Sequence, residues 1–348
     1  MTSQPTPKQA GYRMPAEWAP HERTWMMWPS RAEVWTDMEE TRRNYAAVAH
    51  AIRDFEPLTM LVRPGDVAAA RSMLGGDIDI LDHPIDDSWA RDAGPCFLVH
   101  DTGDRAGVSF RFNAWGGKYA PYDGDDSAAD AIMDAAGVRS FVSTLIAEGG
   151  GVSVDGKGTI LTTDSCFPNA NRNPDWTRDQ IERELMDMLG GTKVIWLPGN
   201  VEETETDGHV DGTAVFIAPG LVAIEAEGAP DHPWCAINRA NIDAMQGQID
   251  ATGRPIKLIT MEEASGELSD GDDMFCRSYV NSYLCNGGVI MPEYGVAEDA
   301  AAREIFEEHL PSRRVVSVRI DAIAIGGGGI HCITQQEPKA PQSTMRDN

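Results

Sequence analysis

Residues 324–336, near the C-terminus, read AIGGGGIHCITQQ and combine one thiol with a run of four glycines. Consecutive glycines allow positive φ and close approach of the backbone to a ligand, so this stretch predicts a tight loop. The loop carries Cys332, with His331 before it and the polar Thr334 after it. A thiol held on such a loop is a candidate nucleophile. The alternative is a buried structural cysteine, because free cysteine is among the most buried residue types.

A second stretch, TDGHVDG, supplies the best candidate base. His209 and Asp211 are two residues apart in it, so in an extended segment both side chains project from the same face. A carboxylate beside an imidazole favours the imidazolium and orients the ring. The pair could equally bind a metal, but zinc sites gather several His and Cys ligands and no second histidine lies nearby. The flanking glycines at 208 and 212 indicate close backbone approach, which favours a functional site.

Carboxylates on two further loops could bind a cation. Residues 86–95, DDSWARDAGP, hold three acids, an arginine and a tryptophan. They form either a solvated turn or a cation site, in which Asp92 makes two parallel hydrogen bonds and Trp89 stacks on a planar cation. Glu148 precedes three glycines, where a lone acid is usually a turn residue. A thiol lined by carboxylates suits a substrate that is both a cation and an electrophile, and guanidinium meets both conditions.

The composition restricts the partners. The chain has 348 residues with 29 basic and 55 acidic side chains, a net charge of -26. This charge repels phosphate and argues against nucleic acid or an anionic membrane as a partner, and it favours a small cationic substrate. No apolar run approaches the roughly 18 residues of a membrane span, and no signal peptide is expected. No serine elbow, P-loop or dinucleotide fingerprint is present, so no cofactor is indicated.

The cysteines indicate the redox environment of the chain, and the composition of its ends predicts flexible tails. The six cysteines show no CxxC spacing, which predicts neither a zinc site nor a disulfide framework and indicates reduced thiols in a cytoplasm. Residues 1–10 are polar and contain proline, and we expect them and residues 338–348 to be flexible tails. The sequence leaves open a homo-oligomer.

The elements that must position these residues recur five times. In each unit a helical stretch leads to a short β-rich run and then to a loop dense in glycine and acidic residues. The expected helices span 66–74, 127–136, 177–189, 236–251 and 300–310. The expected strands span 78–81, 140–142, 193–197, 256–259 and 315–318. Before them we expect a helix at 36–55 and a strand at 58–62. The polar loops lie about 55 to 65 residues apart, a spacing typical of repeat architectures.

A unit of this length cannot bury its own apolar face, so five units are expected to pack around an axis as an α/β repeat. Equivalent loops would then meet at one end of that axis and bring Asp92, Glu148, His209 and Cys332 into one site. The fourth unit would contribute the acidic loop 270–273. The alternative is an ordinary α/β sandwich in which the spacing is accidental. Length alone suggests two domains, although a closed repeat of this size can be one.

Six motifs resemble those of the agmatine deiminase family, which belongs with the bacterial-type peptidylarginine deiminases in the guanidino-group-modifying superfamily. In chain order they are GYRMPAEW at 11–18, DSWARD at 87–92, FNAWGGKY at 112–119, NRNP at 171–174, ETDGHVD at 205–211 and GGGIHCITQQ at 327–336. The resemblance implies a five-bladed α/β propeller of ββαβ modules, the pentein type, with one catalytic domain over residues 1–348. It agrees with the five units inferred from the spacing.

The resemblance also implies catalytic roles. Cys332 attacks the guanidinium carbon to form an amidino-thioether. His209 protonates the departing ammonia and then activates the water that cleaves the thioether. Asp92 and Asp211 hold the guanidinium nitrogens. Glu148 joins them and orients His209.

The remaining implications concern the substrate. Trp89 packs on it, and Glu205 or Asp207 meets a distal amine. The implied reaction converts agmatine and water to N-carbamoylputrescine and ammonia, a step towards putrescine, without a metal or an organic cofactor. The alternatives are a deiminase for another small guanidino compound or for peptidyl arginine, an enzyme that transfers the amidino group to an amine, and a non-catalytic protein that binds guanidines or polyamines.

Overall fold

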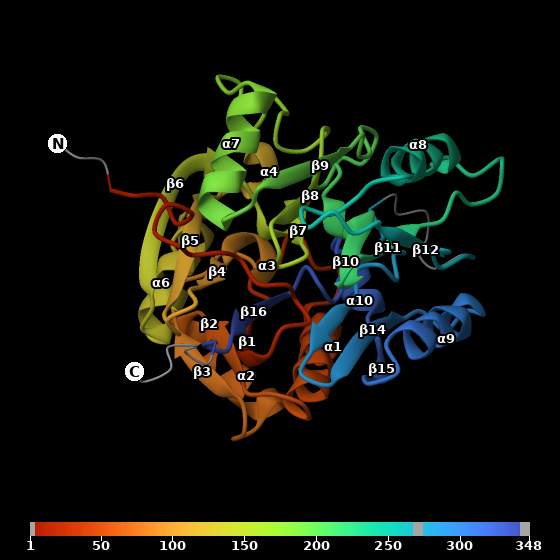
Figure 1. Cartoon of the computed structure of the whole chain (residues 1–348). Helices are drawn as coiled ribbons and strands as arrows, with labels where there is room; N and C mark the ends of the chain where they lie inside the picture. Colours follow the sequence, from red (N-terminus) through yellow and green to blue (C-terminus); the bar gives the residue numbers. More distant parts are fainter. Residues whose placement is uncertain (1–3, 267–273, 342–348) are drawn as a thin grey trace.

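The computed structural model describes residues 4–266 and 274–341, which form five small sheets arranged in a ring (Figure 1). One sheet has four strands and the other four have three strands each. In every sheet one antiparallel strand pair is followed by a parallel pair whose strands are joined through a helix, and the four-stranded sheet has a second such parallel pair. The predicted five-bladed α/β propeller is therefore confirmed, and the sandwich alternative is wrong.

The first blade joins the two ends of the chain. Its elements are β1 (His21–Met27), α1 (Met38–Arg53), β2 (Leu58–Val62), η1 (Pro64–Asp66), α2 (Val67–Leu74), β3 (Asp79–Asp82) and β16 (Thr334–Pro338). Strand β1 pairs antiparallel with β16 and parallel with β2. The last strand of the chain thus becomes the inner strand of the first blade and closes the ring.

Each of the other four blades has an inner, a middle and an outer strand, with the main helix between the last two. The second and third blades contain β4 (Cys96–Val99), β5 (Arg105–Arg111), α6 (Ala128–Ala136) and β6 (Arg139–Ile146), then β7 (Ser153–Val154), β8 (Thr159–Thr163), α7 (Arg178–Leu189) and β9 (Lys193–Leu197). The fourth and fifth contain β10 (Ala214–Ala218), β11 (Leu221–Glu225), α8 (Cys235–Met245) and β12 (Lys257–Met261), then β13 (Tyr283–Cys285), β14 (Gly288–Glu293), α9 (Glu298–His309) and β15 (Arg314–Arg319). Short helices in the connections are α3 (Ala90–Ala93), α4 (Ala114–Gly117), α5 (Asp123–Asp126), η2 (Gly149–Gly151), η3 (Val210–Gly212) and α10 (Asp321–Ala324).

Most of the predicted helices begin and end within two residues of the positions expected from the local sequence. Helix α7 starts with a capping box, in which Thr177 and Gln180 satisfy each other's backbone N–H groups, and it stops at Gly190, which has φ of 70°. All five predicted repeat helices and strands are present. Two boundaries were wrong by more than two residues. The helix expected at 236–251 ends at Met245, because Gln246 turns to extended backbone and Gly247 takes φ of 72°. The strand expected at 140–142 runs from Arg139 to Ile146.

The connection between blades decides where the loops lie. In Figure 1 the helices α6, α7, α8 and α9 lie at the periphery, and β7, β10 and β16 lie near the centre. The predicted repeat strands are β3, β6, β9, β12 and β15, each at the outer edge of its sheet. The chain must therefore cross from the rim to the axis to begin the next blade. Five such crossings place five loops near the axis.

Three of the expected features involve residues outside the described ranges. Residues 1–3 and 342–348 are not described, and neither is the acidic loop expected at 270–273. The mobility of the tails 1–10 and 338–348 stays a prediction. Within the described ranges no helix has the length and apolarity needed to cross a membrane.

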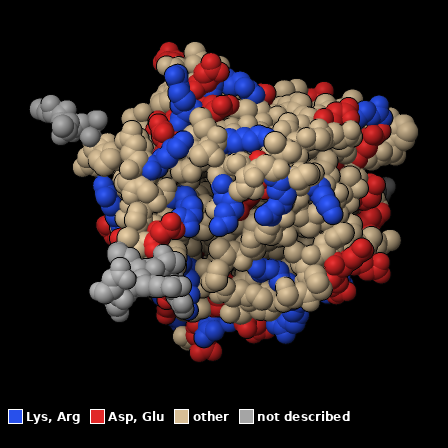
Figure 2. Space-filling view, viewed as in Figure 1, with Lys and Arg blue, Asp and Glu red and all other residues tan. Residues whose placement is uncertain are grey.

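Figure 2 shows Lys and Arg side chains across the middle of one face, with acidic side chains mostly towards its rim, so the net charge is unevenly distributed.

Candidate active site

All five rim-to-axis loops deliver a polar side chain to one place. Each of these residues precedes the inner strand of the next blade by two to five positions. They are Asp92 in the first loop, Glu148 in the second, His209 and Asp211 in the third, Asn281 in the fourth and Cys332 in the fifth. The predicted convergence of Asp92, Glu148, His209 and Cys332 is confirmed by the ion pairs and contacts that follow.

The imidazole of His209 is buried among three carboxylates. Its Nδ1 lies 3.8 Å from Oδ1 of Asp92 and 4.0 Å from Oδ1 of Asp211, and its Nε2 lies 3.7 Å from Oε2 of Glu148. Burial opposes the charged form, but Asp92 and the nearby Cys166 and Glu148 outweigh it and raise the pKa of His209 well above its ordinary value. The resting imidazole is therefore a cation that can donate a proton.

The thiol of Cys332 is buried beside an acid and an amide. Its Sγ lies 3.7 Å from Oδ2 of Asp211 and 3.3 Å from Oδ1 of Asn281. Burial, Asp211 and Asp92 raise the pKa of this thiol well above its ordinary value. These surroundings favour the thiol form, whereas a cation bound between these carboxylates would favour the thiolate.

Two carboxylates of the site are held in contrasting ways. Asp92 accepts hydrogen bonds from Nε1 of Trp115 at 2.8 Å and from the N–H of Gly150 at 2.9 Å, and burial beside Asp211 and Glu148 raises its pKa despite His209. Glu148 is also buried, but Arg172 and His209 together outweigh burial and lower the pKa of the carboxyl. Nε of Arg172 donates to both Glu148 oxygens, at 2.8 and 3.1 Å.

A glycine is required at 150 because three functional side chains crowd that position. A Cβ atom there would lie 2.6 Å from Nδ1 of His209, 2.8 Å from Oδ1 of Asp92 and 3.0 Å from Oδ2 of Asp211. We expect Gly150→Ala to lower kcat/KM by about 100-fold, since displacement of such groups by about 1 Å has that effect. Steady-state kinetics with a thermal melt measures it. The matched control is Gly212→Ala, whose Cβ meets nothing within 4 Å; equal losses in both variants would contradict the prediction.

The site opens into a cavity that includes Cys332 and Asp92 in its lining. Its walls are aromatic and glycine-rich, and they comprise Trp89, Trp115, Tyr119, Gly326, Gly327 and Gly328 with Val34, Asp87, Glu205 and Thr206. Glu205 is half-buried and accepts a hydrogen bond from the hydroxyl of Tyr119 at 2.7 Å. Trp115, which donates to Asp92, packs edge-on against Tyr119, whose hydroxyl donates to Glu205, so two aromatic rings connect these two acids of the cavity.

The structure separates the two residues expected near a distal amine. Asp207 forms ion pairs with Nζ of Lys118, at 2.9 Å, and with Arg172, and it accepts from Nδ2 of Asn171 at 2.9 Å. It is not among the residues that line the cavity, whereas Glu205 is. Two cations already neutralise Asp207, so Glu205 is the better placed of the two for a cationic substrate group.

Several residues of the site were not predicted from the sequence. Arg172 and Trp115 lie in motifs used for the family resemblance, but nothing local shows that they contact Glu148 and Asp92. Asn281 belongs to the fourth loop, where the sequence favoured the acids at 270–273. Its place shortly before β13 is the signal that could have found it, because the other four loops carry their functional residue at the equivalent point. Asp211 was expected beside His209, but its shortest imidazole contact is with His331, at 2.7 Å.

A metal could be considered at Glu148, Cys166 and His209, whose donor atoms lie within 4.8 Å of one another. Thiolate, imidazole and carboxylate are the ligands of a zinc site. However, Arg172 already donates to both oxygens of Glu148, and its charge opposes a bound cation. The ion pair with Arg172 accounts for this buried carboxylate without a metal.

The five-bladed ring and its buried thiol, imidazole and carboxylates define the class of protein, the pentein-type enzymes that hydrolyse guanidino C–N bonds. Residues 13–338 match the family described as Porphyromonas-type peptidyl-arginine deiminase. The chain belongs to that family.

Similar proteins cover nearly the whole chain. The agmatine deiminase of Pseudomonas aeruginosa is 40% identical over 357 residues, which cover 96% of this chain and 97% of that protein. The agmatine deiminase of Ectopseudomonas mendocina is 38% identical and covers 97% of this chain, with 98% of its own length matched. A solved structure of the agmatine deiminase of Enterococcus faecalis superposes with a TM-score of 0.93 at 36% identity, covering 97% of this chain and 99% of the other.

Proposed function

We propose that this protein is an agmatine deiminase, which hydrolyses agmatine to N-carbamoylputrescine and ammonia. The observation that carries the proposal is the cavity, whose lining includes Cys332, Asp92 and Glu205 and the rings of Trp115 and Tyr119 that connect the two acids. Agmatine has a guanidinium at one end, an amine at the other and an apolar chain between them. The names of the full-length relatives support the same substrate.

In the first half-reaction, Asp92 and Asp211 accept hydrogen bonds from the guanidinium nitrogens. The bound cation lowers the thiol pKa, and Cys332 releases its proton to solvent. The thiolate adds to the guanidinium carbon, and the His209 imidazolium protonates one nitrogen, which leaves as ammonia. The product of this step is an amidino-thioether and a neutral His209.

In the second half-reaction, neutral His209 takes a proton from water as the oxygen adds to the amidino carbon. The thiolate then departs and takes up the proton that the new hydroxyl group loses, which leaves N-carbamoylputrescine, the Cys332 thiol and the His209 imidazolium. Glu148 stabilises the cationic form of His209 from 3.7 Å, and Arg172 holds Glu148. In this scheme Trp89 packs along the substrate chain. No metal enters either step.

The first experiment measures ammonia release by the purified protein from agmatine, arginine, guanidinobutyrate and an arginine peptide. We expect release from agmatine that exceeds the other three. Faster release from another small guanidino compound would support the same reaction with that compound as the substrate. Faster release from the peptide would favour the peptidyl-arginine alternative. A transferred amidino group on an added amine would favour an amidinotransferase, whereas binding without turnover would leave a guanidine- or polyamine-binding protein. Prior treatment with a chelator should leave the rate unchanged.

Glu205 provides a direct test of the distal end. We expect Glu205→Gln to raise KM for agmatine about 10-fold or more with a smaller change in kcat, because a charge-assisted contact to the amine is lost. The control is Glu202→Gln, an exposed acid on the same loop that is not among the cavity residues. An unchanged KM in Glu205→Gln would remove Glu205 from the binding site. If Asp207→Asn alone raised KM, the assignment would move to Asp207.

The setting of the reaction belongs to the same proposal. All five blades contribute to one site, which supports a single catalytic domain over residues 1–348. The six cysteines are free thiols, which supports a cytoplasmic protein. The net charge of -26 disfavours nucleic acid as a partner, and assembly into a homo-oligomer is left to a measurement of mass in solution.

A further inference from the structure

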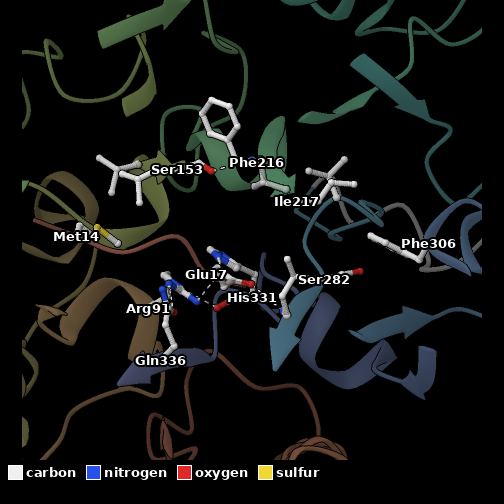
Figure 3. A pocket seen from close by; sticks show the side chains of 15 residues that line it. Met14, Glu17, Arg91, Ser153, Phe216, Ile217, Ser282, Phe306, His331 and Gln336 are labelled. Carbon is white, nitrogen blue, oxygen red and sulfur yellow. Dashed lines mark hydrogen bonds and ion pairs between the residues drawn. The ribbon is translucent and has the colours of Figure 1, made fainter. Parts of the chain in front are cut away.

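His331 lies beside the thiol in the sequence but faces a different part of the molecule. Together with Glu17, Arg91 and Gln336 it lines a second cavity. Figure 3 shows these four polar side chains close together within a largely apolar lining, with dashed lines joining Arg91, Glu17 and His331. Glu17 belongs to the motif at 11–18, for which the catalytic scheme has no role.

Both ring nitrogens of His331 contact a carboxylate. Nδ1 lies 2.7 Å from Oδ2 of Asp211, and Nε2 lies 2.8 Å from Oε2 of Glu17. Two carboxylate partners require a proton on each nitrogen, so the ring is an imidazolium. All three side chains are shielded from solvent, with exposed fractions of 6% for His331, 2% for Asp211 and 14% for Glu17. Oδ2 of Asp211 is also the atom 3.7 Å from Sγ of Cys332.

Glu17 is itself held in place from a third direction. Its Oε1 accepts the backbone N–H of Leu284 at 2.8 Å, and its Oε2 lies 3.5 Å from Nη2 of Arg91. Burial opposes the carboxylate form, but His331 and then Arg91 outweigh burial and lower the pKa of Glu17 to about 2. The N-terminal segment thus supplies a permanent negative charge behind the imidazole.

The charged groups around His331 and Asp211 favour the imidazolium form of His331 and the carboxylate form of Asp211. Burial and Arg91 oppose the imidazolium, but Glu17 and Asp211 raise the pKa of His331. Burial opposes the Asp211 carboxylate, but His331, followed by His209 and Arg91, lowers the pKa of that carboxyl. Asp92 and Cys332 also face Asp211.

Asp92 is the informative comparison. It shares the site with Asp211, but its side-chain oxygens accept from Trp115 and Gly150 rather than from an imidazolium. The pKa of its carboxyl is raised, whereas that of Asp211 is lowered. The difference between the two acids therefore follows from their hydrogen-bond partners, which are an indole and a backbone amide for Asp92 and an imidazole for Asp211.

We propose that His331 is a positioning residue, an imidazolium held by Glu17 that fixes the Asp211 carboxylate, as an anion, against the guanidinium and beside the thiol. This inference rests on the proposed function, in which Asp211 holds a guanidinium nitrogen. It also gives the N-terminal motif a role, because Glu17 keeps the imidazole charged and correctly turned. The two histidines then have different roles. His209 exchanges protons with the substrate, whereas His331 stays protonated.

The test compares His331→Asn with wild type over pH 5 to 9. Asparagine can still donate one hydrogen bond to Asp211 but carries no charge, so Asp211 should protonate at a higher pH. We expect the acid limb of kcat/KM for agmatine to move up by about one pH unit, with a fall of about tenfold or more at pH 7. Glu17→Gln should move the same limb in the same direction, and His50→Asn, an exposed histidine, should not.

A binding measurement keeps the inference testable if turnover is lost. In a Cys332→Ala background, calorimetry with guanidinium ion as the probe reports Asp211 without chemistry. We expect His331→Asn to shift the pH at which binding is half lost upwards. A lowered melting temperature with an unmoved acid limb in both assays would show a purely structural role and overturn the proposal. If the wild type releases no ammonia from agmatine but His331→Asn still shifts the pH dependence of guanidinium binding as predicted, only the proposed substrate is refuted.

Discussion

Replacement of Cys332 by alanine is expected to abolish ammonia release while guanidinium binding persists. The proposed chemistry passes through a bond from this sulfur to the guanidinium carbon, and no other described thiol lines the cavity. Loss of a covalent nucleophile lowers kcat by about 10⁴-fold or more. Guanidinium binding should persist because the carboxylates of Asp92 and Asp211 are unchanged. Steady-state ammonia assays and calorimetry with agmatine measure the two effects.

The control for this variant is Cys235→Ala, which removes a thiol on α8 that is not among the cavity residues. It should retain full activity. Wild-type enzyme quenched during turnover should also carry a mass increase on the peptide containing Cys332. Turnover by Cys332→Ala near the wild-type rate would rule out the covalent scheme, and an adduct on another cysteine would reassign the nucleophile.

Replacement of Arg172 by leucine is expected to have the largest effect on stability. Its guanidinium is fully buried, bridges Glu148 and Asp207, and donates to the carbonyl of Thr206 at 2.9 Å. Removal of one partner from a buried ion pair typically costs about 3–5 kcal/mol, because the remaining charge is left without compensation. Urea denaturation at pH 7 measures the free energy of unfolding. Activity should fall as well, because Glu148 loses the group that holds it near His209.

The pH dependence distinguishes this mechanism from a simple packing defect. The pKa of Glu148 is lowered in the folded wild type, so the carboxylate contributes stability above the unfolded value of 4.5, and that contribution is lost as the pH falls through the folded pKa. Without Arg172, buried Glu148 should take up a proton instead. The stability difference between the two proteins should therefore narrow as the pH is lowered from 7 towards 4.5.

Arg178→Leu is the matched control, since it breaks an ion pair with Asp164 in which both side chains are about half exposed. Surface pairs contribute roughly 0 to 1 kcal/mol, so its effect should be small. Glu148→Gln added to Arg172→Leu should recover part of the stability, because the unpaired charge is gone. Equal destabilisation by the Arg172 and Arg178 variants would contradict the assignment of Arg172 as the buried partner of Glu148.

The architecture and most of the site were readable from local features of the sequence. Five recurrences of helix, strand and polar loop predicted five units around an axis, because a short βα unit must share its apolar face with neighbours. Glycines marked the positions where the backbone approaches functional groups, as at Gly150 and in the loop before Cys332. The thiol, the imidazole and the acids were each visible as an unusual residue beside glycine. A local pattern of this kind is readable without knowing what lies opposite it.

The pairing of the charged groups, in contrast, is a property of the tertiary structure alone. His209 and Asp211 are neighbours in sequence, but His331, 120 positions further along the chain, makes the shorter contact with Asp211. Arg172 neutralises Glu148 and also pairs with Asp207, and Asn281 reaches the thiol from the loop between the fourth and fifth blades. Charge state depends on burial and on partners within a few ångströms. Those distances arise when closure of the ring by β1 and β16 brings five separate loops to one axis, which no local pattern encodes.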